Sequence, residues 1–353
     1  MNNRSILLDR VSNLPVRGIT AAKSSYSQGC EREFYSEADY WWRDPDDPAG
    51  KYIGRDGESN PDCFNRHRKR LMRLSCIIGF LTSNYLQKPD KAVLAKISEH
   101  LDIWFADEKI SMLPHLEYSQ AIRNQVPGRS FGVIDTIHLA EVALAVIKLK
   151  SDLPEKLYTA VKEWFAQYLQ WLCNSNLGAT ERLALNNHSV CWYLQAAAFA
   201  HLTENEALLE EFRNDFKNRL LEQIAPDGSL PEELERTKPY GYELFTLEAF
   251  AGLAALLSVK SDNYFLIRKD NGGTVFEAVN FMCPYIEDKN RWFGSADIKY
   301  FDYWPVKQNA LYLVNTFCGN ADFKALWQSL PDYKLKFELV RNYPVRTPEL
   351  WIL

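Results

Sequence analysis

The sequence predicts an all-α protein whose helices form an α/α toroid, an incomplete barrel of helical hairpins. Beyond residue 65, roughly ten to twelve successive segments place their apolar residues at helical spacing. No convincing series of alternating strands interrupts them. Segments that are apolar on one face alternate with segments that are apolar on nearly all sides, as expected for an outer and an inner layer of helices. No repeat of fixed period is visible, which argues against a regular solenoid.

The amphipathic segments account for the outer helices. The first, residues 65–81, carries the basic run RHRKR, which we interpret as a solvated helix face. In residues 157–173 one helical stripe collects large apolar side chains: Leu157, Val161, Trp164, Tyr168 and Leu172. Residues 203–224 open with a capping-box pattern, Thr203 and Glu206, and end at the turn APDGS.

The inner helices are predicted where almost every position is apolar. Residues 135–149 and 189–202 have this character and should be buried on all sides. Three later segments continue the helical series: 245–257, 274–286 and 307–317. We therefore expect one α/α-toroid domain that spans residues 1–353.

The first 64 residues differ from the rest of the chain. They are rich in Asp, Gly, Pro and aromatic residues, as in YSEADYWWRDPDDPAGKYIGRDGESNPD, and we expect irregular backbone there. A disordered tail is the alternative, but the aromatic residues of YWW and KYI are anchors that such tails usually lack. We expect a lid-like loop over a cleft.

Composition and charge exclude several classes of function. With a net charge of −5 and a pI of about 5.8, the chain lacks the basic footprint of a nucleic-acid-binding protein. The seven cysteines are scattered and form no CxxC pair, which predicts neither a disulfide framework nor a zinc ribbon. The six histidines never occur in pairs with ligand spacing, and neither HExxH nor GxSxG is present, so we expect no metal and no cofactor.

The start of the sequence bears on localisation. MNNRSILLDRVSNL lacks the apolar stretch of a secretory signal, and no segment is long enough to span a membrane. We expect a cytoplasmic protein as the sequence stands, or a periplasmic or secreted one if a leader was removed.

Two segments combine polar side chains with the start of an apolar helix. Asn187 and His188 head the segment 189–202, where amides and an imidazole either cap the helix or face a cavity. Arg236 precedes Tyr240 and Tyr242 at the head of another apolar segment, and its structural interpretation is an ion pair with Glu232 or Glu233. By themselves, neither segment decides between a structural and a functional role.

Two further segments are weaker candidates. In RNQVPGRSFGVIDTIHL, Arg129 lies between two glycines and His138 follows Asp135, a possible helix cap; the glycine spacing of a nucleotide-binding loop is missing. In FGSADIKYFDYWPVKQ, Lys299, Tyr303 and Trp304 could line a cleft, although a packed aromatic cluster explains them as well.

Taken together, these segments resemble the alginate lyase superfamily of polysaccharide lyases, which have the helical-toroid fold. The resemblance rests on YSEADYWW…KYIGRDGESNPD, PGRSFGVIDTIHL, NNHSVCW and LPEELERTKPYGYELFTL, in family order over residues 35–250, with weaker similarity to about residue 305. It implies a catalytic set of Asn187, His188, Arg236 and Tyr242. The spacing from Arg236 to Tyr242 is slightly shorter than in the best-known alginate lyases, which points to a different branch, and some relatives act on glucuronan. The substrate-binding residues that it implies are Tyr40, Trp41, Trp42, Arg55, Gln125, Arg129, His138, Trp192, Tyr240, Lys299 and Trp304.

The chemistry that the resemblance implies suits these residue types. β-Elimination removes the C5 proton of a 4-linked uronate, which becomes acidic enough only when the neighbouring carboxylate is neutralised. Hydrogen bonds from Asn187 and Arg236 would do this and stabilise the enolate-like intermediate, each contributing roughly 3 kcal/mol. Tyr242 would take the C5 proton and protonate the leaving O4, since a phenol with a pKa near 10 becomes a usable base beside a cation. His188 would assist in neutralisation, or act as the base where the proton lies on the opposite face, as in guluronate.

Two other functions remain open on the sequence alone. A glycoside hydrolase on the same kind of toroid would use a pair of carboxylates, and Asp135, Glu232, Glu233 and Asp297 are available. A carbohydrate-binding protein would keep the groove without turnover. For all three the expected partner is a carbohydrate, for the lyase an acidic polysaccharide or oligosaccharide; we expect neither nucleic acid nor a membrane as a partner.

Overall fold

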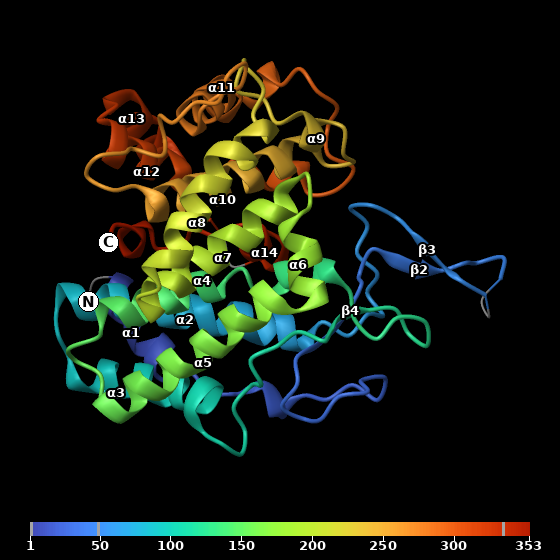
Figure 1. Ribbon diagram of the computed structural model, residues 1–353, viewed down its shortest axis with the longest axis vertical. Coiled ribbons are helices and arrows are strands. Elements are labelled where there is room, and N and C mark those ends of the chain that lie inside the picture. The colour runs from blue at the N-terminus through green and yellow to red at the C-terminus, as the bar shows by residue number, and fades with distance from the viewer. Residues whose placement is uncertain (1–2, 48–49, 334–335) are drawn as a thin grey trace. The chain divides into compact units, whose positions relative to one another are not determined.

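The computed structural model describes residues 3–47, 50–333 and 336–353, and the secondary structure of these parts is almost entirely helical (Figure 1). The chain divides into two compact units that interleave along the sequence. Unit 1 comprises residues 1–53, 60–181 and 198–204, and unit 2 comprises residues 54–59, 182–197 and 205–353. The prediction of one domain over residues 1–353 stays a prediction.

Unit 1 is built from helices and a few short strands. Its helices are α1 (Asn3–Ser12), α2 (Arg66–Gln87), α3 (Lys91–Leu101), α4 (Leu139–Lys148), α5 (Glu155–Asn174) and α6 (Asn176–Arg182), whose last residue belongs to unit 2. Its strands are β1 (Tyr35–Glu37), β2 (Trp41–Arg43), β3 (Tyr52–Gly54), which ends in unit 2, and β4 (Tyr118–Ala121). β1 pairs with β4 in parallel and β2 pairs with β3, so three short strands, β1, β2 and β3, stand in the segment predicted to be irregular. That prediction is also wrong for residues 3–12, which contain neither Gly nor Pro and form helix α1 against α2.

The predicted helical stripe of residues 157–173 is confirmed in α5. Val161, Trp164, Tyr168 and Leu172 are buried there, while Leu157 is only half-buried near the start of the helix. A cluster of aromatic rings explains the burial, because Trp164 and Tyr168 pack against one another and Trp164 against Phe105.

The basic run at the start of α2 is not a solvated helix face throughout. Arg68 is only 2% exposed, and its two terminal nitrogens bind Asp39 at 2.9 Å and Asp135 at 3.0 Å. Asp135 also accepts hydrogen bonds from Ser36 and Gln120. A buried guanidinium needs this neutralisation because it has lost its hydration. The triad therefore joins α2 to the turn that follows β1 and to the short helix at residues 130–136.

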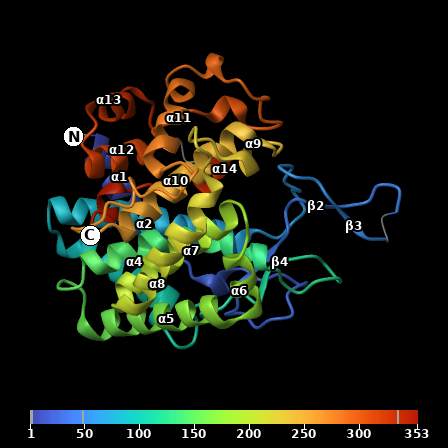
Figure 2. The same ribbon diagram turned by 45° about the horizontal axis from the view of Figure 1, so that its top comes forward.

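Unit 2 is organised around one fully buried helix. It contains the first part of α7 (Asn187–Thr203), then α8 (Glu206–Asn218), α9 (Pro231–Leu234), α10 (Pro239–Leu257), α11 (Val275–Glu287), α12 (Asn309–Cys318), α13 (Ala321–Ser329) and α14 (Phe337–Arg341). Every residue of α10 is buried, and α8, α9, α11 and α12 contact it. α12 and α13 lie side by side in both views (Figures 1 and 2). The prediction of a helix over residues 245–257 is therefore confirmed, and the structure shows that this helix is an inner one.

One predicted helix boundary is wrong. Thr203 does not cap the following helix, because it is the last residue of α7 and its hydroxyl donates to the carbonyls of Phe199 and Ala200. The N-cap of α8 is Asn205, whose side chain accepts from Leu208 N. The capping-box pattern misleads here because two helices meet with only two residues between them.

In the parts of the chain that the structure describes, no single helix is long and apolar enough to cross a membrane. The bent pair formed by residues 130–136 and α4 meets that criterion by length and composition only.

Candidate active site

The amide and imidazole pair stands at the first turn of α7, as the sequence indicates. The carboxylate of Glu233, in α9, accepts two hydrogen bonds from this turn. The backbone N–H of Asn187 donates to Oε1 at 2.9 Å, and its side-chain Nδ2 donates to Oε2 at 2.8 Å. Asn187 is 3% exposed, and its Oδ1 has no hydrogen-bond partner among the described residues. His188 is half-buried next to it. The amide is thus fixed in one orientation with a buried acceptor left over.

Arg236 follows α9 directly and is held by two carboxylates. Asp56 binds it in a bidentate manner, at 3.1 Å to Nε and 2.7 Å to Nη2, and Glu233 Oε2 lies 3.7 Å from Nη1. Burial opposes the charge of Arg236, but the bonds with Asp56 and the charges of Tyr242, Asp56 and Glu233 outweigh it and raise the pKa of the guanidinium. Arg236 therefore remains a cation with its plane fixed.

The loop that supplies Asp56 approaches the chain near Arg236 closely. Asp56 also accepts from the backbone N–H and hydroxyl of Thr237, at 3.4 and 2.9 Å. Gly57 adopts a positive φ of 75°, and a Cβ there would lie 2.6 Å from Thr237 Oγ1, so this glycine permits the approach. Burial raises the pKa of Asp56, but hydrogen bonds and charge from Arg236, together with Thr237, lower it overall.

Tyr242 lies in the first turn of α10 and is 6% exposed. Two cations face its ring: the guanidinium carbon of Arg236 at 4.4 Å from the ring centroid and Nζ of Lys238 at 5.0 Å. Lys238 is itself buried and paired with Glu338 of α14 at 2.8 Å. Positive charge on a phenol ring favours the phenolate electrostatically.

Glu233 links the residues of this group to one another. It binds Asn187 and Arg236, and the charge of His188 also acts on it. Burial raises its pKa, although Asn187, Arg236 and His188 each act in the opposite direction. The sequence presented Glu233 as a structural partner of Arg236 or as a hydrolase carboxylate. Its contact with Asn187, 46 residues away along the chain, is the feature that no sequence pattern revealed.

The start of α10 is fixed by Asp297. Its carboxylate accepts from Tyr240 N at 2.9 Å and Gly241 N at 3.0 Å, two of the backbone donors that a helix leaves without internal partners. Burial raises the pKa of Asp297 to about 6, against those hydrogen bonds. A cavity of about 10 Å³ beside Tyr242 is lined by Asp297, Lys299 and Trp304, among others. Asp297 and Asp135 both accept hydrogen bonds that hold the fold together. The interpretation as a glycoside hydrolase is therefore left without a defined pair of carboxylates.

Comparison with known proteins identifies the family of the chain. The family model described as "Alginate lyase" matches residues 18–292, most of the chain. The chain belongs to the alginate lyase family. It is a polysaccharide lyase, an enzyme that cleaves by β-elimination. No match was found among curated proteins.

Solved structures of alginate lyases share the fold. An alginate lyase from Bacteroides ovatus is 27% identical with a TM-score of 0.83, over 96% of this chain and 91% of that one. Alginate lyase A1-III from Sphingomonas species A1 is 15% identical with a TM-score of 0.61, over 99% and 93%. A tyrosine-to-phenylalanine variant of A1-III complexed with a tetrasaccharide matches with a TM-score of 0.59 at 15% identity, over 97% and 91%. These similarities confirm the predicted α/α-toroid fold class.

Three residues that the family resemblance placed at the substrate have no surface to offer it. Tyr240 is fully buried, its hydroxyl donates to Tyr285 O, and its ring packs on Trp292 and Phe301. Trp192 is fully buried against Tyr193 and Phe212. His138 is 2% exposed in unit 1. The burial of these three side chains argues against direct contact with a substrate.

The remaining predicted binding residues divide between the two units. In unit 2, Lys299 is 40% exposed and lies 3.6 Å from Glu58, Arg55 is half-buried, and Trp304 is 5% exposed at the small cavity beside Tyr242. In unit 1, Gln125 is exposed, Tyr40 is half-buried, and Arg129 is held by Gln120 and stacks on Trp41. The prediction that the aromatic loop lies over a cleft stays a prediction.

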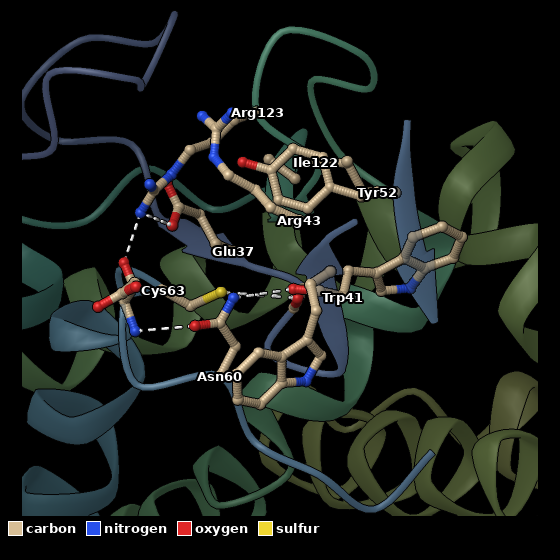
Figure 3. A pocket seen from close by; sticks show the side chains of 12 residues that line it. Glu37, Trp41, Arg43, Tyr52, Asn60, Cys63, Ile122 and Arg123 are labelled. Atoms are coloured by element: carbon tan, nitrogen blue, oxygen red, sulfur yellow. Dashed lines mark hydrogen bonds and ion pairs between the residues drawn. The ribbon is translucent and has the colours of Figure 1, made fainter. Parts of the chain in front are cut away.

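Trp41 and Trp42 line a cavity of about 130 Å³ in unit 1 (Figure 3). Arg43 and Tyr52 contribute to it, and the Arg43 guanidinium lies 5.4 Å from the Tyr52 ring centroid. Figure 3 shows Glu37 and Arg123 joined at one wall and Asn60 reaching the backbone of Trp41. Polar atoms of Glu37, Arg123 and Asn60 are thus engaged in bonds within the protein, and the indole of Trp41 lies beside them.

Among the described residues, no group of three or more His, Cys, Asp or Glu is arranged to hold a metal ion.

Proposed function

We propose that this polysaccharide lyase cleaves 4-linked uronic-acid polymers or oligomers, glucuronan or polymannuronate, by metal-independent β-elimination. The observation that carries the proposal is the stacking of Arg236 on Tyr242, 4.4 Å from guanidinium carbon to ring centroid, with Glu233 joining Arg236 to Asn187. A cation, an amide and a phenol are the groups that such an elimination needs.

Arg236 neutralises the uronate carboxylate, and the second N–H of the Asn187 amide, which is not the one bonded to Glu233, is proposed as a further donor to it. Asp56 and Glu233 hold the two side chains in place, so little reorganisation accompanies the development of negative charge. The unsatisfied Oδ1 of Asn187 accepts a hydrogen bond from a sugar hydroxyl or from a protonated carboxyl group. His188, the half-buried neighbour, adds a further donor.

Tyr242 performs the proton transfers. As phenolate it removes the proton from C5, the C4–C5 double bond forms as the C4–O4 bond breaks, and the phenol returns the proton to O4. Arg236 and Lys238 favour the phenolate that begins the cycle. The products are a shortened chain that keeps the bridging oxygen as the hydroxyl of a new reducing end and an oligomer with a 4,5-unsaturated uronate at its non-reducing end. The cations Lys299 and Arg55 of unit 2 are proposed to bind flanking sugars.

Incubation with polyglucuronate, polymannuronate and polyguluronate tests the proposal. A lyase produces the ultraviolet absorbance of the C4–C5 double bond, a hydrolase produces reducing ends without it, and a binding protein produces neither.

Tyr242→Phe isolates the proposed base, and Tyr240→Phe is its matched control two residues earlier on α10. We expect Tyr242→Phe to lower kcat by on the order of a thousandfold or more, since it removes both proton transfers. Tyr240→Phe loses only a hydrogen bond to Tyr285 O and should keep most of the rate. An unchanged rate in Tyr242→Phe, with the fold intact, contradicts the assignment.

A further inference from the structure

Unit 1 has a cluster of arginines far along the chain from the proposed catalytic residues. Arg17, Arg70 and Arg73 line a cavity of about 80 Å³ together with Pro15, His100 and Trp104. None of the three guanidinium groups forms an ion pair with a carboxylate among the described residues, whereas the buried Arg68 on the same helix has two. Three positive charges thus line one cavity, and none of them is paired with a carboxylate in the part of the chain that the structure describes.

The floor of the cavity adds a second, independent observation. His100, at the end of α3, is 2% exposed, and its Nε2 has no hydrogen-bond partner among the described residues. Burial, followed by the charge of Lys96, lowers the pKa of His100 to about 4; Glu99 acts in the opposite direction and Arg73 in the same one. The imidazole is therefore neutral near pH 7, and its Nε2 can carry a proton for donation. A buried polar atom without a partner, on a residue that lines a cavity, is rarely left unused.

The arginines repel one another. Burial lowers the pKa of Arg70, and the charges of Arg17, Arg66 and Arg73 lower it further. Two nitrogens of Arg70 donate to the carbonyls of Gly18 at 3.1 Å and Ala21 at 2.7 Å, and Trp104 Nε1 donates to the carbonyl of Arg17 at 3.1 Å. The segment that carries Arg17 is thereby held against α2 and the turn after α3, so the cluster persists in spite of the repulsion.

We propose that this cavity, lined by Arg17, Arg70, Arg73 and His100, binds a phosphate-type oxyanion, either inorganic phosphate or the phosphate group of a phosphorylated metabolite. A cavity that holds one water needs roughly 10–15 Å³, so about 80 Å³ accommodates the several heavy atoms of such a group. Three uncompensated cations favour a dianion over a monocarboxylate, and guanidinium groups match the paired oxygens of phosphate. The bound anion would connect the segment before residue 18 to α2 and α3.

Thermal unfolding and isothermal titration of the full-length protein at low ionic strength test the site. Inorganic phosphate and a hexose 6-phosphate serve as two arms that distinguish the free anion from a metabolite. Sodium chloride at matched ionic strength and free glucuronate serve as comparison ligands. We expect phosphate or the sugar phosphate to raise Tm and bind one per chain, and chloride and glucuronate to bind at least tenfold more weakly. Equal binding of glucuronate, or no binding of either phosphate ligand, overturns the proposal.

Two exposed arginines allow a variant that leaves the packing intact. Arg17→Gln/Arg73→Gln should weaken phosphate binding by roughly tenfold or more, because it removes two charge-assisted contacts. Arg10→Gln, an exposed arginine of α1 outside the cavity, removes a comparable charge and should bind phosphate as the unmodified protein does. Loss of binding in Arg10→Gln to the same extent would assign the effect to net charge and refute a defined site. The lyase reaction plays no part in these readouts, so failure of one proposal leaves the other standing.

Discussion

Replacement of Glu233 by Gln is the sharpest perturbation of the proposed site. The buried carboxylate accepts two hydrogen bonds from Asn187, at 2.9 and 2.8 Å, and lies 3.7 Å from Arg236. A glutamine has the same shape but one acceptor oxygen. It can therefore satisfy the backbone N–H of Asn187 or its side-chain Nδ2, and presents its own amide donor to the other.

The expected magnitude follows from the bond that is lost. A hydrogen bond to a charged group contributes about 1.5–3 kcal/mol, and each 1.4 kcal/mol in the activation free energy corresponds to a factor of ten. If the orientation of Asn187 matters to the elimination, Glu233→Gln should lower kcat/KM by roughly 10- to 100-fold. Glu232→Gln, at the exposed neighbouring position of α9, is the matched control and should stay within about twofold.

The assay is the initial rate of absorbance increase from the unsaturated product, measured on the uronan that the protein cleaves best. A thermal melt of each variant separates loss of catalysis from loss of fold. The reasoning is refuted if Glu233→Gln is folded and retains kcat/KM within twofold of the unmodified enzyme.

Three further outcomes are expected. The double variant Lys238→Met/Glu338→Gln removes both members of a buried ion pair. Because one of the two cations beside the phenol of Tyr242 is lost, the rise of kcat with pH should move to higher pH. An unmoved pH profile contradicts the proposed role of Lys238. Arg68→Met should lower the free energy of unfolding by about 3–5 kcal/mol in denaturant titrations, since two buried carboxylates lose their counter-charge. The pKa of Asp297 is raised to about 6, so protonation of this carboxylate stabilises the folded state below about pH 4, and that stabilisation is lost as pH rises through 6. Asp297→Asn should therefore flatten the dependence of the unfolding free energy on pH across that window. An unchanged slope would count against the assignment.

Helix positions were predictable from the sequence because burial of one helix face spaces the apolar residues at the helical period. This spacing is visible within a single segment. The apolar stripe of residues 157–173 and the apolar run of residues 245–257 each specify their surroundings without knowledge of the partner helix. Local signals failed where two elements meet. Thr203 and Glu206 fit a capping box, but the preceding helix extends through Thr203 and Asn205 provides the cap.

The candidate catalytic set was predictable in part. Asn187, His188, Arg236 and Tyr242 are residues whose type and order along the chain resemble those of a family, and this information is present in the linear sequence. What the four side chains contact is not. The surroundings of the two tyrosines could not be predicted from the sequence either, because Tyr240 and Tyr242 are only two residues apart on one helix. Their packing differs: the hydroxyl of Tyr240 donates to a backbone carbonyl, whereas the ring of Tyr242 lies beside two cations.

The sequence by itself thus determined the helical class, the family and the residue types of the candidate site. The tertiary structure decided which polar and charged side chains meet: Glu233 with Asn187, Asp56 with Arg236, and Arg68 with two aspartates. It also brings three arginines to one cavity, where none of them pairs with a carboxylate of the described residues. The physical reason is the range of the two kinds of information. Apolar periodicity is a property of a few turns of chain, whereas ion pairs join residues that are tens or hundreds of positions apart, and their strength depends on the water that folding removes.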